Sequence, residues 1–568
     1  MRKPKLEEMT LREKIGQTVC FRHLLLEEFE TMEQLREYFA NNPIGSTWSM
    51  GHPKETYKVM QEYLGNPELK GYKDNMYVDF INILNQILPV PILPAIDAIE
   101  GIAPRKFDQH EPLPVATSLG ATRDPELAYR YGKAIAEDLK SIGIRWLWSP
   151  VADNAGVFKD LRHLSSDVEI NCILLKAFIR GMHDAGIAAG AKHFPGKDPY
   201  EYRDSHFCTA SYSQSFEQWE KTQGKEFQAC IDAGVDSIMV GHVTFKAVDD
   251  TQINGRLLPA TLSHKILTGL IKKKMGFEGV LLTDDIKMRS VSAIYPQEKL
   301  YVEALRAGID VVVGPTRLDY IDIVEQAVLS GDLPESRIDD ACRRVLNLKE
   351  RHGLFESDKP IPHLEEQERD RIRMQNRKVT QDIVSKGMTL AANRTGFLPI
   401  DQKNIRTVKV FYLGYSDECF ENLKYMAEEF ALHGAACDIE DGIPNDVIIT
   451  GADFDVKEGK LDLDQYDLII YANYIGNFAP VGGYYFFGDK CLQLRNAMTR
   501  CHEKCIGVSF GDPNIFFNYY TAAHTFINAY SMNPETMRYF VKGLYGEIQF
   551  ADYAPFPLNP ITRTNEVY

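Results

Sequence analysis

Residues 187–206 have the sequence IAAGAKHFPGKDPYEYRDSH, and this stretch decides the fold. Its first five residues are an apolar run typical of a buried strand, and the run ends in Lys192 and His193. A Pro-Gly turn then leads to a polar loop that carries Asp204 and His206. A carboxylate two residues before an imidazole can hold one ring nitrogen and raise the basicity of the other. The stretch therefore predicts a buried strand followed by a loop with an Asp-x-His pair.

Apolar runs that end in polar residues recur along the first 355 residues. They alternate with amphipathic helices, predicted at 124–142, 170–185 and 218–233, as in a parallel sheet of βα units. The predicted strands are 44–50, 91–97, 146–153, 187–194, 237–243, 279–285 and 311–315. In a (β/α)8 barrel the strand ends and the loops after them form the active site. An open doubly wound sheet would place a ligand at the same strand ends, so both architectures remain open at this point.

The predicted strand 279–285 finishes in two adjacent carboxylates, Asp284 and Asp285. Burial on both faces explains the aliphatic residues of this strand but not the two acids. One interpretation is a helix N-cap, a position that Asp suits well. The other is a carboxylate nucleophile, and each interpretation could hold for one of the two residues. Beside the loop with Asp204 and His206, we prefer the nucleophile.

The chain beyond residue 355 predicts a second, smaller α/β domain. A helix at 337–351 closes the first part, and the charged stretch 356–373 is typical of an interdomain linker. A helix is expected at 376–392, followed by strands at 407–413, 468–473, 505–510 and 525–529. We therefore predict a first α/β unit over 1–355, a linker and connecting helix over 356–393, and a smaller α/β domain over 394–568.

The composition excludes several classes of partner. The net charge is −16, whereas binding to nucleic acid or to an anionic membrane requires a basic surface. No segment has the length of a membrane span, and residues 1–8 contain no apolar signal region. The ten cysteines are scattered, mostly in apolar segments, as is typical of reduced thiols. We expect a cytoplasmic protein.

Several motifs together resemble a known family. Lys-His-Phe-Pro-Gly at 192–196 and Asp-Ser-His at 204–206 are similar to the signature of the bacterial β-N-acetylglucosaminidases of glycoside hydrolase family 3. Segments that resemble further family motifs follow the family's order, at 9–17, 149–153, 239–242, 259–263, 276–280 and 307–310. A weaker similarity at 509–513 and 544–547 resembles the two-domain members. The resemblance implies a (β/α)8, TIM-like catalytic barrel over 1–355 followed by a smaller α/β sandwich domain over 394–568.

The resemblance also implies a role for each matching residue. Asp284 is implied as the nucleophile, and Asp285 is the less favoured candidate. His206 is implied as the acid/base, with Asp204 orienting it. Asp284 would attack the anomeric carbon while His206 protonates the leaving oxygen, and water would then release the sugar with retained configuration. The implied sugar-binding residues are Asp97, Arg162, Lys192 and His193.

Three differences from the family concern the substrate. Lys197 and Asp198 replace the usual His-Gly or Asp-Gly pair, and the segment up to Asp204 is one residue longer. Asp97 is followed by Ala-Ile-Glu-Gly, which is intermediate between the acetylglucosaminidase and β-glucosidase patterns. The differences leave the retaining mechanism intact. We expect the loop to close over the sugar with Gly196 as a hinge.

Four functions are consistent with these residues. The first, which we predict, is an exo-acting retaining β-N-acetylhexosaminidase. The second is a phosphorylase, in which phosphate intercepts the same intermediate on Asp284. The third is a β-glucosidase whose acid/base would be a Glu of the small domain. The fourth is a non-catalytic sugar-binding relative, which the presence of Asp284, Asp204 and His206 disfavours.

We expect no cofactor and no metal, because two side chains suffice to cleave a glycoside. The cysteine cluster of Cys501, His502 and Cys505 lacks the second ligand pair of a metal site. The expected partner is a small glycoside or oligosaccharide. The aromatic, glycine-rich loop 477–488 either stacks on sugar rings or forms a domain or homodimer interface. His242, at a strand end, is interpreted as a structural residue.

Overall fold

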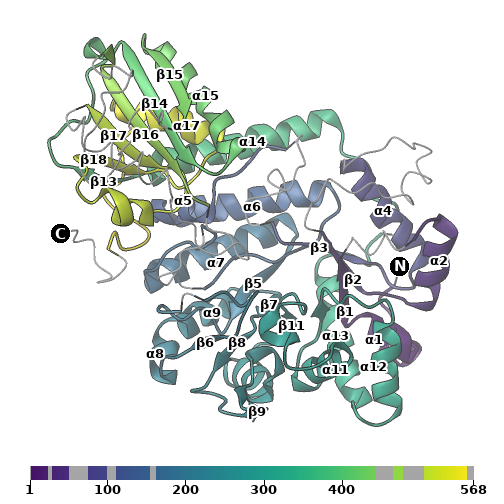
Figure 1. The fold of residues 1–568 in the computed structure, drawn as a ribbon. Coiled ribbons are helices and arrows are strands. Elements are labelled where there is room, and N and C mark those ends of the chain that lie inside the picture. Colours follow the sequence, from purple (N-terminus) through teal and green to yellow (C-terminus); the bar gives the residue numbers. More distant parts are fainter. Residues whose placement is uncertain are drawn as a thin grey trace. The chain divides into compact units, whose positions relative to one another are not determined.

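The computed structural model describes residues 2–22, 29–49, 74–98, 110–153, 161–201, 203–357, 359–442, 465–476 and 504–559. The contacts between residues divide the chain into two compact units (Figure 1). The first consists of Met1–Pro112, Ala128–Gly156 and Val168–Asn376, and the second of Leu113–Leu127, Val157–Asp167 and Arg377–Tyr568. The predicted domain boundaries at 355 and 393 stay predictions.

Eight parallel strands of the first unit form a nearly closed barrel. In spatial order they are β11 (Val280–Thr283), β7 (Ser237–Val240), β5 (Ala188–Phe194), β4 (Trp146–Leu147), β3 (Leu93–Ile96), β2 (Ser46–Ser49), β1 (Val19–Arg22) and β12 (Val312–Val313). A bridge between Leu282 and Val311 joins the two ends of this order, and the Thr283 amide donates to the Val311 carbonyl at 3.1 Å. The predicted (β/α)8 barrel is confirmed, and the open sheet is excluded.

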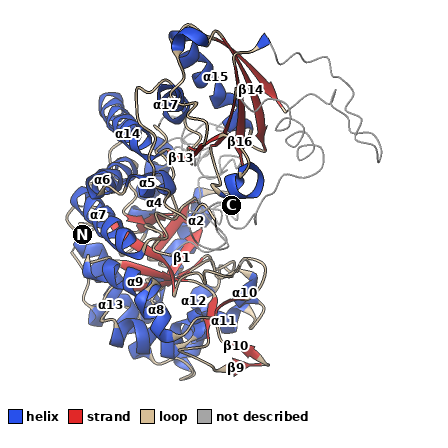
Figure 2. Ribbon diagram, turned by 90° about the vertical axis from the view of Figure 1, so that its left-hand side faces the viewer, coloured by secondary structure: helices blue, strands red, loops and turns tan. Residues whose placement is uncertain are grey.

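Helices surround the strands of this unit in Figures 1 and 2. The longer ones are α2 (Met32–Asn41), α4 (Asp74–Ile87), α6 (Pro125–Ser141), α7 (Val168–Ala185), α9 (Gln223–Asp232), α11 (Gln297–Ala307), α12 (Tyr320–Leu329) and α13 (Glu335–Arg351). The predicted helices 124–142 and 170–185 correspond to α6 and α7. The predicted helix 218–233 is two helices, α8 (Phe216–Lys221) and α9, because the backbone of Thr222 leaves the helical conformation.

Seven barrel strands coincide with predicted ones, and β1 is the strand that the sequence analysis missed. It has only four residues and follows closely after α1 (Leu11–Gly16). Its neighbours β2 and β12 lie elsewhere in the chain, so its place in the barrel depends on long-range pairing. A short apolar run of this kind carries a weak signal in the sequence alone.

The second unit contains a six-stranded sheet. Its spatial order is β13 (Thr389–Asn393), β18 (Thr525–Asn528), β17 (Cys505–Ser509), β16 (Leu468–Tyr474), β14 (Thr407–Gly414) and β15 (Ala436–Asp441). Only β13 pairs in antiparallel fashion among these described strands. Helices α15 (Asp417–Leu432) and α17 (Pro534–Leu544) pack on the sheet and bury Leu423, Met426 and Phe540 against it (Figure 2). This unit is the smaller α/β domain that the sequence predicts.

The predicted helix 376–392 is wrong at both ends. Helix α14 spans Glu366–Gly387, and residues 389–393 form strand β13 instead. The charged stretch interpreted as a linker enters this helix, where ion pairs three residues apart join Arg369 to Glu366 and Arg371 to Glu368. Such pairs stabilise a helix. The charged stretch is therefore helical from Glu366 onwards, and its role as a linker between domains stays a prediction.

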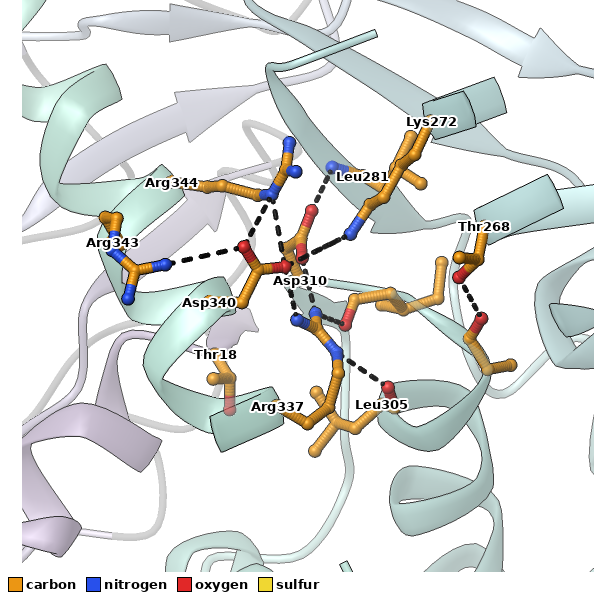
Figure 3. A network of polar contacts seen from close by, with 12 residues as sticks. Thr18, Thr268, Lys272, Leu281, Leu305, Asp310, Arg337, Asp340, Arg343 and Arg344 are labelled. Carbon is orange, nitrogen blue, oxygen red and sulfur yellow. Dashed lines mark hydrogen bonds and ion pairs between the residues drawn. The ribbon is translucent and has the colours of Figure 1, made fainter. Parts of the chain in front are cut away.

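A network of buried charges ties the amino ends of the barrel strands to the helices outside (Figure 3). The fully buried carboxylate of Asp310 accepts hydrogen bonds from the Leu281 amide at 2.9 Å, from Lys272 Nζ at 3.0 Å and from the Arg337 guanidinium. Arg337 also donates to the Ile309 carbonyl at 2.7 Å. Asp310 therefore neutralises two cations that lie between β11, β12 and α13.

Replacing Asp310 by Asn should lower the free energy of unfolding by about 3 kcal/mol, because Lys272 and Arg337 would lose their buried counter-charge. Urea unfolding measures this change. The control is Asp332→Asn, which removes a largely exposed partner of Arg306 and should cost less than about 1 kcal/mol. Equal losses in the two variants would contradict the assigned role of Asp310.

Lys349 of α13 should make the stability of the barrel depend on pH. It is fully buried, and its Nζ donates to the Gln17 side chain at 2.6 Å and to the Pro91 carbonyl at 2.7 Å. Burial lowers the pKa of Lys349 to about 7. An unfolded lysine has a pKa of about 10.4, so the unfolded state binds the proton more tightly between these values. The free energy of unfolding should therefore rise as the pH rises from 7 towards 10.

Replacing Lys349 by Met should remove this dependence. Between pH 7 and 9, the free energy of unfolding of the wild type should increase more steeply than that of the variant, by up to about 1.4 kcal/mol per pH unit. Urea unfolding at several pH values measures both slopes. The exposed Lys273→Met is the control and should keep the wild-type slope. A variant slope equal to that of the wild type would refute the assignment.

Candidate active site

The stagger of the barrel strands determines which side chains reach the same height. Followed once around the barrel, the strand pairings return to β1 with the register shifted by eight residues. This stagger of eight residues is the one expected of a (β/α)8 barrel, and it averages one residue per strand. Inward-facing side chains at one height therefore come from alternate strands.

The uppermost inward layer, at the carboxyl ends of the strands, brings together four charged residues. They are Arg22 in β1, Asp97 directly after β3, Lys192 in β5 and Asp284 directly after β11. Lys192 is fully buried, and its Nζ donates to Asp97 Oδ1 at 2.5 Å. The layer below consists of Trp48, Trp148, Met239 and Val313, all in the barrel core. Three predicted site residues thus share one layer with Arg22, which the sequence analysis missed together with β1.

His193 is held beside this layer by Asp153. Its amide donates to Asp153 Oδ1, and its ring Nδ1 lies 3.0 Å from Asp153 Oδ2. Asp153 is fully buried and follows β4, whereas part of the His193 ring is exposed. The carboxylate therefore fixes the orientation of the imidazole and places the proton on Nδ1. Asp153 is a predicted strand-end residue, but no signal in the sequence links it to His193.

The predicted pair of Asp204 and His206 forms a hydrogen-bonded dyad. Asp204 Oδ1 accepts from the His206 amide at 2.9 Å and lies 2.7 Å from His206 Nδ1. Burial raises the pKa of Asp204, but its hydrogen bonds to His206 and the charges of His206 and Lys197 lower it more. Asp204 therefore stays ionised, and proton exchange with a substrate would use His206 Nε2.

The loop that carries Asp204 and His206 is called the dyad loop below. Two backbone hydrogen bonds tie it to the turn that follows Asp284. The Arg289 amide donates to the His206 carbonyl at 3.1 Å, and the Ser290 amide donates to the Ser205 carbonyl at 3.3 Å. Both donors belong to the short helix α10 (Arg289–Ser292), four residues beyond Asp285. The dyad and the candidate nucleophile are therefore parts of one connected structure.

Asp284 and Asp285 have different surroundings. Burial raises the pKa of Asp284, but the imidazoles of His193, His242 and His206 and the Asp285 amide together lower it below its ordinary value. The Asp285 side chain instead accepts from the Lys287 amide at 3.0 Å and lies 3.4 Å from Lys287 Nζ. The geometry supports a nucleophile at Asp284 and a turn-stabilising role for Asp285.

His242 is fully buried between neutral groups, as expected of a structural residue. Its Nε2 lies 3.0 Å from the Asp285 carbonyl, and its Nδ1 lies 2.6 Å from the Thr261 hydroxyl. Burial lowers the pKa of His242, and the opposing effect of Asp284 is smaller. His242 therefore donates from Nε2 to the carbonyl and supports the turn beneath Asp284 and Asp285.

The remaining predicted site features lie elsewhere. Arg162 belongs to Val157–Asp167 of the second unit, and its sugar-binding role stays a prediction. The aromatic loop 477–488 and residues 501 and 502 lie outside the described residues. Within the described ranges, no group of three His, Cys, Asp or Glu side chains is arranged to hold a metal ion. No helix in those ranges has the length and apolar character needed to cross a bilayer.

A family profile matches most of the barrel. The profile is described as the N-terminal domain of glycosyl hydrolase family 3, and it matches residues 10–348. The chain belongs to glycosyl hydrolase family 3. The resemblance of the motifs to this family is thereby confirmed, and the protein is a glycosidase of the family.

Relatives in family 3 carry several activities in their names. A β-N-acetylglucosaminidase/β-glucosidase of Cellulomonas fimi is 23% identical over 507 residues, which cover 84% of this chain and 85% of the relative. A β-hexosaminidase of Xylella fastidiosa is 30% identical over 244 residues, 42% of this chain and 70% of the relative.

Solved structures resemble the whole chain in fold. A β-glucoside phosphorylase has a TM-score of 0.79 at 20% identity and covers 97% of this chain and 94% of its own. A family 3 β-N-acetylglucosaminidase from a Paenibacillus species has a TM-score of 0.76 at 23% identity. The match covers 97% of this chain and 99% of that structure's chain. At these sequence identities the two similarities show a shared fold and nothing more.

Asp198, where this chain departs from the family 3 motif, anchors the dyad loop. Its carboxylate is almost completely buried and accepts from the Ser213 amide and hydroxyl, both at 2.6 Å, and from the Tyr200 amide at 2.8 Å. Next to it, the Lys197 carbonyl accepts from the Gln223 side chain. Gly196 has a φ of +106°, and an added Cβ would lie 1.2 Å from Gln223 Oε1, so glycine is required there.

Replacing Asp198 by Ala should loosen the dyad loop, because three hydrogen bonds to one carboxylate are lost. The amides of Tyr200 and Ser213 should exchange hydrogen at least about tenfold faster, since their acceptor is gone. Hydrogen exchange followed by mass spectrometry measures the rates in peptides of residues 198–213. The control Asp232→Ala, at an exposed position on α9, should leave them unchanged. Unchanged exchange in Asp198→Ala would show that the carboxylate does not anchor the loop.

Proposed function

We propose that this family 3 glycosidase is exo-acting and retaining and removes terminal β-linked N-acetylhexosamine. The observation that carries the proposal is the environment of Asp284. This carboxylate stays ionised among three imidazoles, in one inward layer with the pair of Lys192 and Asp97. An ionised carboxylate at the carboxyl end of a barrel strand is suited to attack an anomeric carbon.

In the first step the carboxylate of Asp284 attacks the anomeric carbon, and the bond to the leaving oxygen breaks. His206 gives its Nε2 proton to that oxygen, while Asp204 keeps Nδ1 protonated and the ring in place. Lys192, Asp97 and His193 would bind the sugar hydroxyls beside this carbon. The step yields a glycosyl ester of Asp284 and a neutral His206.

In the second step a water molecule attacks the same carbon. His206 Nε2 accepts a proton from this water, the bond to Asp284 breaks, and its electron pair returns to the carboxylate. Two inversions at one carbon give net retention. An imidazole takes up and releases protons near neutral pH more readily than an ordinary carboxyl group, so a histidine suits both roles.

The sugar is proposed from the relatives. The names of the Cellulomonas and Xylella relatives include β-N-acetylglucosaminidase and β-hexosaminidase activity. The Asp-Ser-His motif at 204–206 resembles that of the family's N-acetylglucosaminidases. A β-glucosidase remains an alternative, because the Cellulomonas relative carries both names. From the net charge of −16 we also propose that neither nucleic acid nor membrane is a partner, and from the reduced cysteines a cytoplasmic location.

Phosphorolysis is the second candidate, and the similarity in fold to a β-glucoside phosphorylase favours it. An oxygen of hydrogen phosphate would attack the glycosyl ester in place of water. The bond to Asp284 would break with return of its electrons, and a sugar 1-phosphate would leave with the phosphate proton. A neutral His206 would repel the incoming anion less than a carboxylate base would.

Replacing Asp284 by Ala should reduce kcat for 4-nitrophenyl N-acetyl-β-glucosaminide by about 10⁴-fold, because no covalent intermediate can form. Release of nitrophenol measures turnover. The matched control is the adjacent Asp285→Asn, which should retain far more activity than Asp284→Ala. Undiminished turnover in Asp284→Ala would refute the assigned nucleophile.

The same assay separates the candidate activities. A panel of nitrophenyl sugars, including the glucoside, tests the sugar, and added phosphate tests for a sugar 1-phosphate product. Hydrolysis of the N-acetylglucosaminide with a retained product would support the main proposal. A product of inverted configuration would contradict the covalent mechanism.

A further inference from the structure

Arg22 occupies the uppermost inward layer without a charged partner. It pairs in register with Trp48 of β2 and follows the inward-facing Cys20 by two residues. Its guanidinium carbon lies 5.6 Å from the centre of the Trp48 ring. Among the described residues, the side chain of Arg22 forms no hydrogen bond and no ion pair. The guanidinium is therefore a half-buried cation at the mouth of the barrel, and its N–H groups have no acceptor in the part of the chain that the structure describes.

The layer below Arg22 holds two further unpaired donors. The buried indole N–H groups of Trp48 and Trp148, in the layer below, have no hydrogen-bond partner in the described part of the chain. The second cation of the upper layer, Lys192, is already paired with Asp97. A ligand that pairs with these donors must therefore bring acceptor oxygens.

The chemistry proposed for Asp284 strengthens this requirement. In the free protein the upper layer holds two cations, Arg22 and Lys192, and two carboxylates, Asp97 and Asp284. When Asp284 becomes a glycosyl ester, one negative charge is lost and the layer becomes net positive. Charges interact strongly in such a partly buried site. The layer should therefore attract an anion most strongly after the sugar is attached.

We propose that Arg22 binds an oxyanion at the mouth of the barrel, supplied either by free phosphate or by a carboxylate of the glycoside. A guanidinium suits this role, because its planar fork of N–H groups matches two oxygens of one phosphate or carboxylate. The proposal rests on the proposed function for its placement beside the sugar. It extends that function by assigning an anionic group either to the glycoside substrate or to the molecule that attacks the glycosyl ester of Asp284.

Calorimetric titration of the full chain with inorganic phosphate, and separately with glucuronate and glucose, tests the proposal. The wild type should bind phosphate, or should bind glucuronate more tightly than glucose. Arg22→Met should lower the affinity for the anion at least about tenfold. The affinity of Arg22→Lys should lie between those of the wild type and Arg22→Met. The matched control is Arg180→Met on the outer helix α7, because Arg180 also lies over an aromatic ring, 4.9 Å from the centre of Tyr129. It should bind as the wild type does.

The two titrations distinguish the sources of the oxyanion. Loss of phosphate affinity in Arg22→Met, together with sugar 1-phosphate formed by the wild type, identifies free phosphate. Loss of the preference for glucuronate over glucose identifies a carboxylate of the glycoside. The proposal is wrong if Arg22→Met keeps both properties, or if the wild type has neither. Unchanged urea unfolding of the variants excludes a loss of fold.

Failure of the proposed function would appear separately. Titration requires no turnover, so the anion site can be present even if Asp284→Ala remains active. In that case the proposed nucleophile fails and the role of Arg22 stands. Conversely, loss of turnover in Asp284→Ala with unchanged anion binding in Arg22→Met supports the glycosidase mechanism and refutes the oxyanion site.

Discussion

The closure of the barrel is the constraint on which the candidate site depends. Eight strands close only with a fixed stagger, and here the register of β1 is shifted by eight residues after one turn around the barrel. It places the inward side chains of alternate strands at one height, so residues far apart in the chain become neighbours. The uppermost layer joins Arg22 to Asp284 across 262 positions of sequence. A change of one residue in any pairing would move one of these side chains out of the layer.

Charged groups at this end of the barrel are unfavourable to bury, and several of them are held by a nearby partner. Lys192 is paired with Asp97, and His193 with Asp153. Asp284 is stabilised by imidazoles and by one amide rather than by a lysine or arginine. A strong ion pair would hold the carboxylate too tightly for attack on a sugar, whereas neutral and weakly charged groups keep it ionised and accessible. The arrangement therefore suits a nucleophile better than a structural ion pair.

Local patterns in the sequence predict part of this arrangement. Asp204 and His206 lie two residues apart, so their contact needs only a turn, and Lys192 and Asp284 end long apolar runs. The contacts made by Asp198 and Asp153 could not be predicted in this way. Their partners Ser213 and His193 lie 15 and 40 residues away in the sequence. Arg22 was missed because β1 is short and its inward orientation follows from pairing with two distant strands. Long-range register decides these positions, and no local pattern encodes it.

The dyad loop shows how a departure from the family motif can preserve the geometry. A glycine at position 198 would leave the loop free to move, whereas the buried Asp198 holds it through Ser213 and Tyr200. The segment up to Asp204 is longer by one residue, and extra residues cost conformational entropy when a loop becomes ordered. Anchoring by Asp198 offsets that cost before any substrate arrives. A loop that is ordered in advance loses less freedom when it binds, so the longer segment remains compatible with a well-placed His206.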